Sequence, residues 1–381
     1  MAPCSLSPTS MHWYGKVDIH SIATKSGFIH NKVKNPCSVL PVHCEVKTEE
    51  KKLTLTRLVE SEPSPRLESI EAFAPATVAN LGPGFDFLGC AVDGLGDHVG
   101  ASIDERVHPG RVSISSIIGD GGKLSLDAEK NCCAIAAQAT LELLGVASVG
   151  ISLCLNKGLP LGSGLGSSAA SAAAAAVAVN ALFGSPLSKD QLVLAGLVSE
   201  AAVSGYHADN VAPSLLGGFV LINSYEPLKL VPLRFPHQTD LFFVLVSPEF
   251  EAPTKKMRAA LPTHISMKDH ISNCSQAASL VSAVLGGDLL LMGKSLSSDT
   301  IVEPKRSRLI PGMVQVKEAA LQAGAFGCTI SGAGPTAVAI TDSYEWGIVI
   351  GEKMVASFRE HGNLKATAHV QRLDREGART V

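Results

Sequence analysis

A glycine-rich loop between a predicted strand and an alanine-rich helix most constrains how this 381-residue chain can fold. The loop runs Gly162-Ser-Gly-Leu-Gly-Ser-Ser168, between a strand expected at 149–155 and a helix expected at 169–183. Glycines leave backbone N–H groups free to face an anion, and the start of a helix adds about half a unit of positive charge. The segment therefore predicts a phosphate-binding turn at the start of a helix.

Two better-known glycine motifs fit this loop poorly. A Walker A loop ends in Gly-Lys-Ser/Thr, and this loop has no lysine. The dinucleotide fingerprint has two residues between its second and third glycines where this loop has one, and the nearest acid that could hold a ribose, Asp190, lies beyond a full helix. A nucleotide-dependent dehydrogenase and a purely structural turn remain as alternatives. The paired Ser167 and Ser168 favour a phosphate site, since hydroxyls there can cap the helix or reach Mg²⁺.

Composition limits the class of protein. Strands and helices mixed without strict alternation predict an α+β fold, and the length favours two domains. The net charge of −3 and the dispersed basic residues argue against a nucleic-acid partner. We expect no membrane span, because 169–183 is short and mostly alanine and 280–292 contains Asp288. The nine cysteines form no CxxC pair, which favours free thiols over zinc ligands.

The first 44 residues have the composition of a targeting segment. They hold four lysines, one acid and six serines without a compact apolar core, which predicts a plastid transit peptide and a location in the plastid stroma; an ordinary disordered tail is the alternative. Residues 45–65 are predicted as a linker. Two domains are expected to follow, 66–235 and 236–381, with their boundary in the proline-containing stretch 227–236.

Apolar periodicity predicts the remaining elements. Strands are expected at 97–103, 111–117, 218–222, 241–246, 326–331 and 336–340, after a turn-rich segment at 75–89. Helices are expected at 131–144, 188–203, 253–260, 274–285, 289–299 and 312–323, with a last helix and strand to follow. Ser188 is expected to cap its helix. The segment after Arg372 is polar and carries no prediction.

Three motifs together resemble a known family. The run Pro160-Leu-Gly-Ser-Gly-Leu-Gly-Ser-Ser-Ala169 is similar to the phosphate loop of the GHMP kinases, which include galactokinase, homoserine kinase and mevalonate kinase. It departs from many members only in Leu161. Two further family motifs stand in the expected order, PATVANLGPGFD at 75–86 and ISGAGPT at 330–336, the latter expected to lie against the glycine loop. The resemblance covers about 69–372. It implies the two-domain GHMP kinase fold, with an N-terminal domain like ribosomal protein S5 domain 2, a ferredoxin-like C-terminal domain, and ATP between them.

Carried over residue by residue, the resemblance implies a nucleotide site and a metal site. The residues it implies for ATP are Asn131, Pro160, Leu161, Gly162, Ser163, Gly164, Leu165, Gly166, Ser167, Ser168 and Ala169. For Mg²⁺ it implies Ser168 together with Glu200.

On the acceptor side the chain is similar to homoserine kinases. A zwitterion with a hydroxyl needs an anion for its amine, arginines for its carboxylate and polar groups to place its hydroxyl. The implied partners are Asp86 for the amine, Asn80 for the hydroxyl, Arg258, Arg306 and Thr254 on the carboxylate side, and His207, Asp209 and Asn210 beside the reacting group, with Asp209 as candidate base. The implied reaction is ATP-dependent phosphorylation of the side-chain hydroxyl of L-homoserine, giving O-phospho-L-homoserine and ADP. We also expect a homodimer.

Each of these acceptor-side residues, taken singly, also fits a structural role. Asp86 fits an Asx turn, His207 a hydrogen-bonded buried histidine, and Arg258 or Arg306 a surface pair. For the whole chain, a non-catalytic metabolite sensor and a kinase for another alcohol are the alternatives. The intact serine–glutamate pair and the two arginines favour a homoserine-directed kinase.

Overall fold

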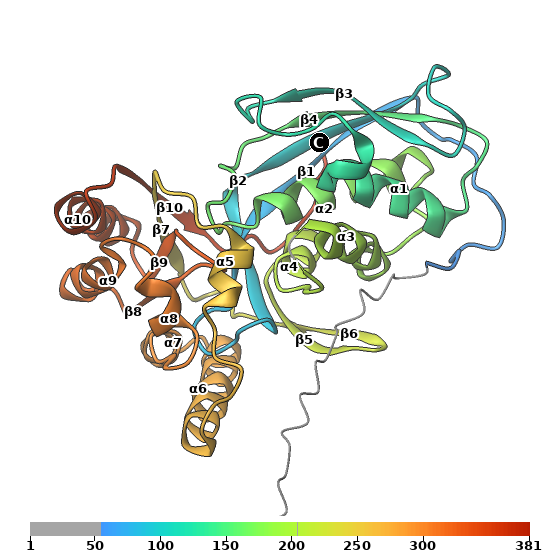
Figure 1. Ribbon diagram of the computed structural model, residues 1–381. Coiled ribbons are helices and arrows are strands. Elements are labelled where there is room, and N and C mark those ends of the chain that lie inside the picture. Colours follow the sequence, from blue (N-terminus) through green and yellow to red (C-terminus); the bar gives the residue numbers. More distant parts are fainter. Residues whose placement is uncertain (1–54, 204) are drawn as a thin grey trace, which may run out of the picture. The chain divides into compact units, whose positions relative to one another are not determined.

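A computed structural model describes residues 55–203 and 205–381 (Figure 1). The predicted transit peptide, 1–44, lies outside these residues, as does the first part of the predicted linker, 45–54. Within the described part of the chain, no helix is both long enough and apolar enough to cross a membrane.

The first layer is a seven-stranded sheet organised around one long strand, β2. Its strands are β1 (Ser69–Ala79), β2 (Leu88–Ile103), β3 (Val112–Ile118), β4 (Ile151–Asn156), β5 (Phe219–Tyr225), β6 (Leu228–Leu233) and β11 (Arg379–Thr380). Along one edge β2 pairs with β1, and along the other it pairs first with β5 and then with β4, all antiparallel. Among the strand pairs of this sheet in the described residues, only β3 and β4 are parallel. The predicted turn-rich segment 75–89 is therefore partly strand.

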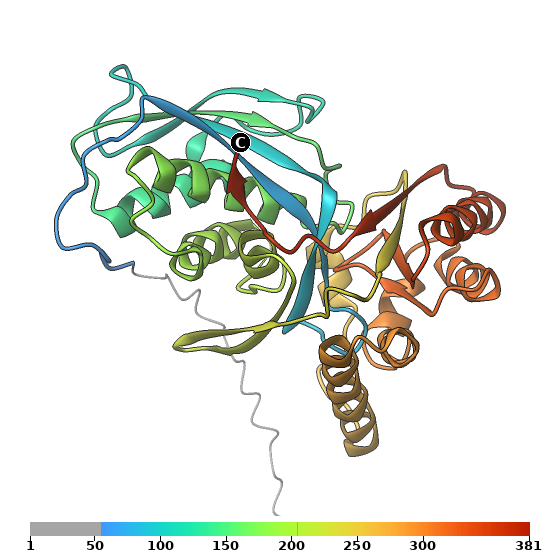
Figure 2. The same cartoon turned by 180° about the vertical axis from the view of Figure 1, so that it is seen from behind.

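Four helices cover one face of this sheet (Figures 1 and 2). They are α1 (Cys132–Leu144), α2 (Ser167–Leu182), α3 (Lys189–Val203) and α4 (Val211–Leu216). Every residue of α2 is buried except Ser168, and alanine suits this position because it lets a helix approach the sheet and its neighbours closely. Ser188 caps α3 as predicted: Gln191 N donates to its hydroxyl over 3.4 Å, while Ser188 N donates to the Gln191 side chain over 2.9 Å.

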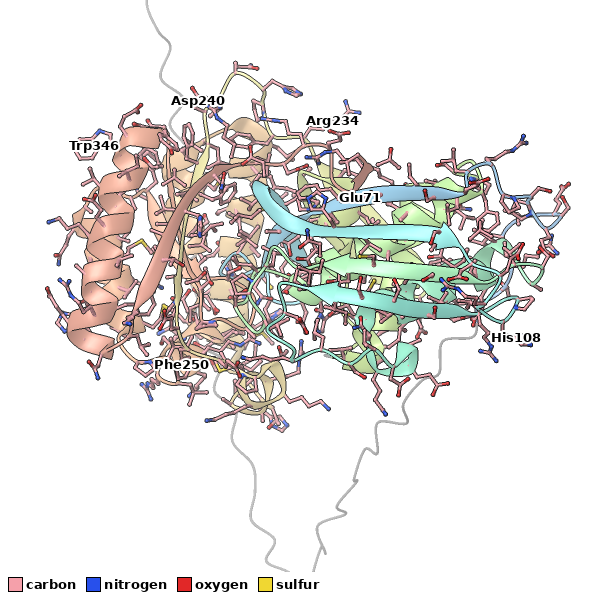
Figure 3. The ribbon with its side chains drawn as sticks, turned by 90° about the horizontal axis from the view of Figure 1, so that it is seen from above. Glu71, His108, Arg234, Asp240, Phe250 and Trp346 are labelled. Atoms are coloured by element: carbon pink, nitrogen blue, oxygen red, sulfur yellow. The ribbon has the colours of Figure 1, made fainter. Side chains whose placement is uncertain are left out.

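The second layer is an antiparallel sheet in the order β10-β7-β9-β8. Its strands are β7 (Phe242–Pro248), β8 (Gly327–Ile330), β9 (Ala337–Thr341) and β10 (Ala366–Arg372). The helices of this half are α5 (Thr254–Ala259), α6 (Met267–Gly286), α7 (Leu289–Leu296), α8 (Glu303–Ser307), α9 (Met313–Gln322) and α10 (Tyr344–Gly362). Figure 3 shows α10, with Trp346 on its outer side, at the opposite end of the molecule from His108.

The alternation along β7 divides the core between two faces. Val244 and Val246 point to the cluster formed with α9 and α10, whereas Phe243 and Leu245 point to a larger cluster that includes the first sheet. Phe219 of β5 lies 6.4 Å from Phe243 between ring centroids. Apolar side chains of the two sheets therefore pack in one shared cluster. This packing holds the segments between the sheets in place.

Helices α4 and α8 were not predicted, and two further stretches differ from the sequence prediction. The proposed boundary loop at 227–236 contains β6, which pairs with β5 as a hairpin. The tail after Arg372 returns to the first sheet, where Leu373 bridges to Val92 and β11 pairs with β1 (Figure 2). The pairing of β11 with β1 is long-range, so no local pattern indicated it. The prolines at 227 and 232 favoured a loop over strand β6. The division into 66–235 and 236–381 stays a prediction.

The described part of the predicted linker, 55–65, has no helix or strand but packs on the first layer. Leu58 N donates to Leu143 O over 2.8 Å, and the Glu62 carboxylate accepts hydrogen bonds from the backbone of Ala147 and Ser148 over 2.9 and 2.8 Å. This segment therefore packs against the end of α1 and the loop that follows it.

Candidate active site

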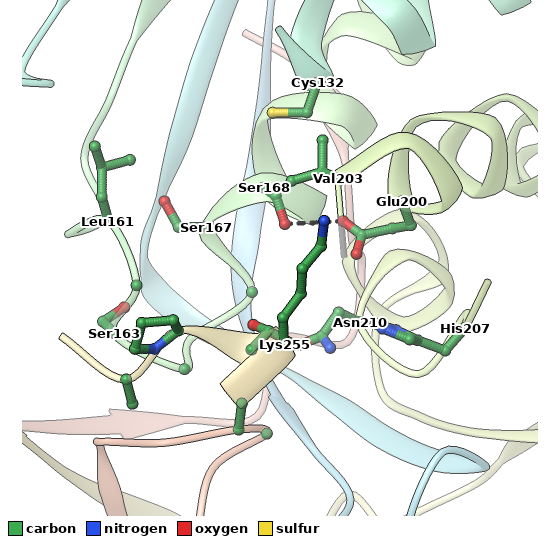
Figure 4. Close-up of a pocket in the computed structure, with 18 of the residues that line it drawn as sticks. Cys132, Leu161, Ser163, Ser167, Ser168, Glu200, Val203, His207, Asn210 and Lys255 are labelled. Carbon is green, nitrogen blue, oxygen red and sulfur yellow. Dashed lines mark hydrogen bonds between the residues drawn. The ribbon is translucent and has the colours of Figure 1, made fainter. Parts of the chain in front are cut away.

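The three motifs meet around one cavity of about 470 Å³, which we call the central cavity (Figure 4). The predicted site residues that line it are Asn80, Asp86, Asn131, Leu161, Gly162, Ser163, Gly164, Gly166, Ser167, Ser168, Glu200, His207, Asp209, Asn210, Thr254, Arg258 and Arg306. Three predicted ATP residues do not line it. Leu165 and Ala169 are buried in the core, and Pro160 is exposed, with its carbonyl accepting a hydrogen bond from the Ser163 hydroxyl over 2.9 Å.

The glycine loop ends in a helix that starts two residues earlier than predicted. Gly166 has φ 67°, so it serves as the N-cap and places Ser167 and Ser168 in the first turn of α2. The first N–H groups of a helix have no acceptor within the helix, so this turn offers donors to an anion. A Cβ on Gly166 would lie 2.0 Å from the Thr77 hydroxyl, which shows how closely the first motif approaches the loop.

The third motif lies against the same loop, as predicted. The Ser331 hydroxyl donates to Gly164 O over 2.7 Å, and Thr336 N donates to Ser163 O over 3.1 Å. Gly164 has φ 83°, and a Cβ there would lie 2.6 Å from Ser331 O. The second sheet thus supports the glycine loop through backbone contacts that leave no room for a side chain.

The first motif connects both halves through Asn80. Its side-chain oxygen accepts from Asp86 N over 3.1 Å, and its amide donates to Gly332 O over 2.9 Å. Asn80 is 6% exposed. Its side chain therefore holds the turn that carries Asp86, in addition to lining the cavity where a hydroxyl contact was predicted.

The predicted acceptor residues contact one another. Arg258 donates to both oxygens of Asp86, each over 2.8 Å, so the residue predicted for an amine and the residue predicted for a carboxylate form a pair. Arg306 is 2% exposed and donates to Gly332 O over 2.7 Å. Burial lowers the pKa of Arg306 to about 10, with the neighbouring Arg258 adding to the effect.

Phe85 contacts both arginines. The guanidinium carbon of Arg258 lies 5.2 Å from its ring centroid and that of Arg306 lies 5.0 Å away. Such contacts attract a cation to the ring face. Sequence reasoning missed Phe85, although its place directly before Asp86 in the first motif was a signal.

His207 and Asp209, which also line the cavity, are both buried and lie close together. His207 Nδ1 is 3.2 Å from an Asp209 carboxylate oxygen, near enough for ion pairing but not aligned for a hydrogen bond, and neither ring nitrogen has a hydrogen-bond partner among the described residues. Burial lowers the pKa of His207. The Asp209 carboxylate raises it by more, so the pKa of His207 lies above its ordinary value. Asn210 accepts a hydrogen bond from the Thr77 hydroxyl over 2.8 Å.

Ser168 and Glu200 also line the cavity and lie together. The Ser168 hydroxyl donates to Glu200 over 2.8 Å, and Glu200 is 2% exposed (Figure 4). Among residues 55–203 and 205–381, no group of three or more acidic, histidine or cysteine side chains is arranged to hold a metal. One hydroxyl and one carboxylate suit Mg²⁺, which takes few protein ligands when phosphates and water complete its shell.

Comparisons with known proteins agree with this arrangement. The family model described as "GHMP kinases N terminal domain" matches residues 131–218, and that described as "GHMP kinases C terminal" matches 280–358. A homoserine kinase of Arabidopsis thaliana is 66% identical over 341 residues, which cover 90% of this chain and 92% of that protein. The chain belongs to the GHMP kinase family.

Two further relatives extend the comparison for this GHMP kinase. A homoserine kinase of Chlorobium phaeovibrioides is 46% identical over 83% of the chain and 100% of that protein. The crystal structure of a homoserine kinase from Cytophaga hutchinsonii matches with a TM-score of 0.78 and 42% identity, covering 84% of this chain and 99% of that one. The family and the α+β GHMP kinase fold predicted from the three motifs are confirmed.

This GHMP kinase also has a buried ion pair beneath its glycine loop that sequence reasoning missed. Lys157 pairs with Asp97, and both are buried. Lys157 donates to the Ser171 hydroxyl over 2.9 Å, while Asp97 accepts from Gly158 N and Leu159 N over 3.0 and 3.1 Å. The pair therefore fixes the start of the loop to α2. A lysine at the end of a predicted strand, just before the loop, was the available signal.

Asn131 and two more lysines complete the rim of the central cavity. Asn131, predicted near the nucleotide, caps α1 by accepting from Cys133 N over 3.0 Å and donates to Ser125 O over 2.9 Å. Lys130 and Lys255 also line the cavity and were missed, because a lone lysine in a loop or short helix has no distinguishing pattern.

Proposed function

We propose that this GHMP kinase transfers the γ-phosphoryl group of ATP to the side-chain hydroxyl of L-homoserine. One observation carries the proposal: the glycine loop lines the same cavity as Asp86, Arg258 and Arg306. The similarity to homoserine kinases over nearly the whole described chain supports the choice of acceptor.

The Asp86–Arg258 pair matches the charges of a zwitterion. On binding, the substrate ammonium takes the place of the guanidinium at Asp86, and its carboxylate takes the place of the carboxylate at Arg258. Arg306, which donates to a backbone carbonyl, supplies a second guanidinium. A ligand with both charges keeps every buried charge partnered, whereas a ligand with one charge leaves a group unpaired.

The transfer itself needs mainly positioning and charge stabilisation. The homoserine oxygen forms a bond to the γ-phosphorus as the bond from that phosphorus to the β–γ bridging oxygen breaks, and ADP leaves with the electron pair. Asp209 is 3% exposed and lines the cavity, so we assign it to accept the hydroxyl proton. We assign His207 and Asn210 to the surroundings of this carboxylate: His207 Nδ1 lies 3.2 Å from it, and the neighbouring Asn210 side chain is fixed by the Thr77 hydroxyl.

We assign Ser168 and Glu200 to Mg²⁺, which when bound offsets the charge of the β- and γ-phosphates. The glycine loop and Asn131 are assigned to ATP. Pro160, Leu165 and Ala169 shape the loop without lining the cavity.

We further propose that residues 1–44 direct the protein to the plastid stroma. The support is the lysine- and serine-containing composition with a single acid. The homodimer also stays a prediction.

An ADP-release assay on the full chain tests the function. ATP and Mg²⁺ would be supplied with L-homoserine, mevalonate, galactose or L-serine in parallel reactions. We expect turnover with L-homoserine at a rate far above that with the other three alcohols. Faster turnover of another alcohol would keep the kinase and overturn the acceptor, and ATP binding without any turnover would indicate a sensor.

A further inference from the structure

The short helix α5 presents three side chains to the central cavity, Thr254, Lys255 and Arg258. Lys255 and Arg258 are three residues apart, so they lie on the same side of the helix. Arg258 reaches the acceptor region, where it pairs with Asp86. In the view of Figure 4, the Lys255 side chain is drawn over the Ser168–Glu200 pair, and all three residues line the central cavity.

Five lysine and arginine side chains line the cavity in the described part of the chain, and two of the lysines are already engaged. Lys157 is buried beneath the loop, where its ammonium contacts Asp97 and donates to Ser171. Lys130 pairs with Asp127 over 2.8 Å at the rim.

The two arginines are engaged as well, Arg258 with Asp86 and Arg306 with the carbonyl of Gly332. Lys255 has no ion-pair or hydrogen-bond partner among residues 55–203 and 205–381, and its side chain is exposed at the cavity. A lysine carries a compact charge on a flexible four-carbon stem, so its ammonium can move to an anion that enters.

The glycine loop itself has no charged group. Its donors are backbone N–H groups and serine hydroxyls, whereas a Walker A loop includes a lysine that reaches the β- and γ-phosphates. A chain of phosphates held only by neutral donors would keep its negative charge next to the buried carboxylate of Glu200. A cation from outside the loop would offset this charge in addition to any metal.

We propose that Lys255 is this cation: its ammonium contacts the terminal phosphates of ATP and stabilises the charge that spreads over the γ-phosphoryl oxygens during transfer. The inference rests on the proposed function for its catalytic part. Lys255 keeps its proton throughout, and no bond to it forms or breaks.

The test compares neighbouring lysines in the full chain. Lys255→Met removes the charge at the cavity, and Lys256→Met removes it one residue away, on an exposed side chain that does not line the cavity. For Lys255→Met we expect kcat to fall about 100-fold, with the KM for L-homoserine changed by less than about twofold. Lys255→Arg should recover part of the loss, and Lys256→Met should match the wild type.

Calorimetry with ATP and with AMP measures equilibrium binding. It tests whether Lys255 contacts the phosphates independently of phosphoryl transfer. Lys255→Met should weaken ATP binding about tenfold and leave AMP binding unchanged, since AMP lacks the terminal phosphates. Wild-type kcat together with an unchanged ratio of ATP to AMP affinity would overturn the proposal, as would an equal effect of Lys256→Met. If no alcohol is phosphorylated by the wild type, the proposed function fails, whereas the binding comparison still decides whether Lys255 contacts phosphate.

Discussion

Arg258 and Asp86 form a bidentate pair, with both hydrogen bonds at 2.8 Å, in the central cavity where we propose that the zwitterionic acceptor binds. Both side chains are only about one-third exposed, so each charge needs a partner. The pair therefore keeps both of these charges partnered before a substrate binds.

Replacing either partner should therefore affect acceptor binding far more than nucleotide binding. For Arg258→Lys we expect the KM for L-homoserine to rise about 100-fold, because lysine cannot bind a carboxylate through two parallel hydrogen bonds. The KM for ATP should change by less than about threefold. Steady-state kinetics with each substrate varied in turn measures this. An equal rise in both KM values would contradict the assignment.

The Ser168–Glu200 pair predicts a change in the response to Mg²⁺. For Glu200→Gln we expect the Mg²⁺ concentration that gives half-maximal rate to rise by at least about tenfold, since a carboxylate ligand is lost. Titrating Mg²⁺ at saturating substrates measures it. Glu142→Gln, on an exposed position of α1, is the matched control and should leave the titration unchanged. A titration of Glu200→Gln that overlays the wild type would remove Glu200 from the metal site.

The Asp97–Lys157 pair predicts a large loss of stability. For Lys157→Met we expect the free energy of unfolding to fall by about 3–5 kcal/mol, because Asp97 would stay buried without its counter-charge. Urea unfolding followed by circular dichroism measures it. Lys123 pairs with Glu251 on the surface, both more than half exposed, so Lys123→Met should give no measurable change. Equal effects of the two variants would contradict the role given to burial.

Substitution by alanine should reduce stability by different amounts at Gly164 and at Gly162. Both have positive φ, 83° and 64°, so alanine at either costs about 1–2 kcal/mol of backbone strain. At Gly164 the new Cβ would also lie 2.6 Å from Ser331 O, whereas at Gly162 nothing lies within 4 Å. Gly164→Ala should therefore be the less stable variant in urea and should raise the KM for ATP more. The reverse order would show that the third motif does not constrain the loop.

The His207–Asp209 contact predicts a pH dependence. The pKa of His207 is raised above its ordinary value of 6.5, so the pair adds stability that is fully present below that pH and is lost as the pH rises through the raised pKa. His207→Gln should therefore lower the free energy of unfolding more at about pH 5.5 than at about pH 9. Urea unfolding at both values measures the difference. A larger effect at the higher pH would mean that the neutral imidazole is the stabilising form.

The sequence alone predicted the features that depend on local order. The strand, glycine loop and alanine helix at 149–183, the capped helix from Ser188 and the three motifs all follow from residues close together in the chain. Glycines that free backbone donors and apolar residues with a helical period act within a few residues, so their consequences are visible without a fold. The family and the cavity residues of the glycine loop followed from them.

The tertiary structure decided what depends on distant residues. The pairing of Asp86 with Arg258, the place of Phe85 against two arginines and the lysine–aspartate pair under the loop each join segments brought together only by packing. The tail beyond Arg372 joins the first sheet for the same reason. A charged side chain has no preferred partner in the sequence. Its partner is the opposite charge that the fold brings within hydrogen-bonding distance. The strength of the pair depends on how far the fold removes the two charges from water. Only the three-dimensional arrangement determines this distance and this burial.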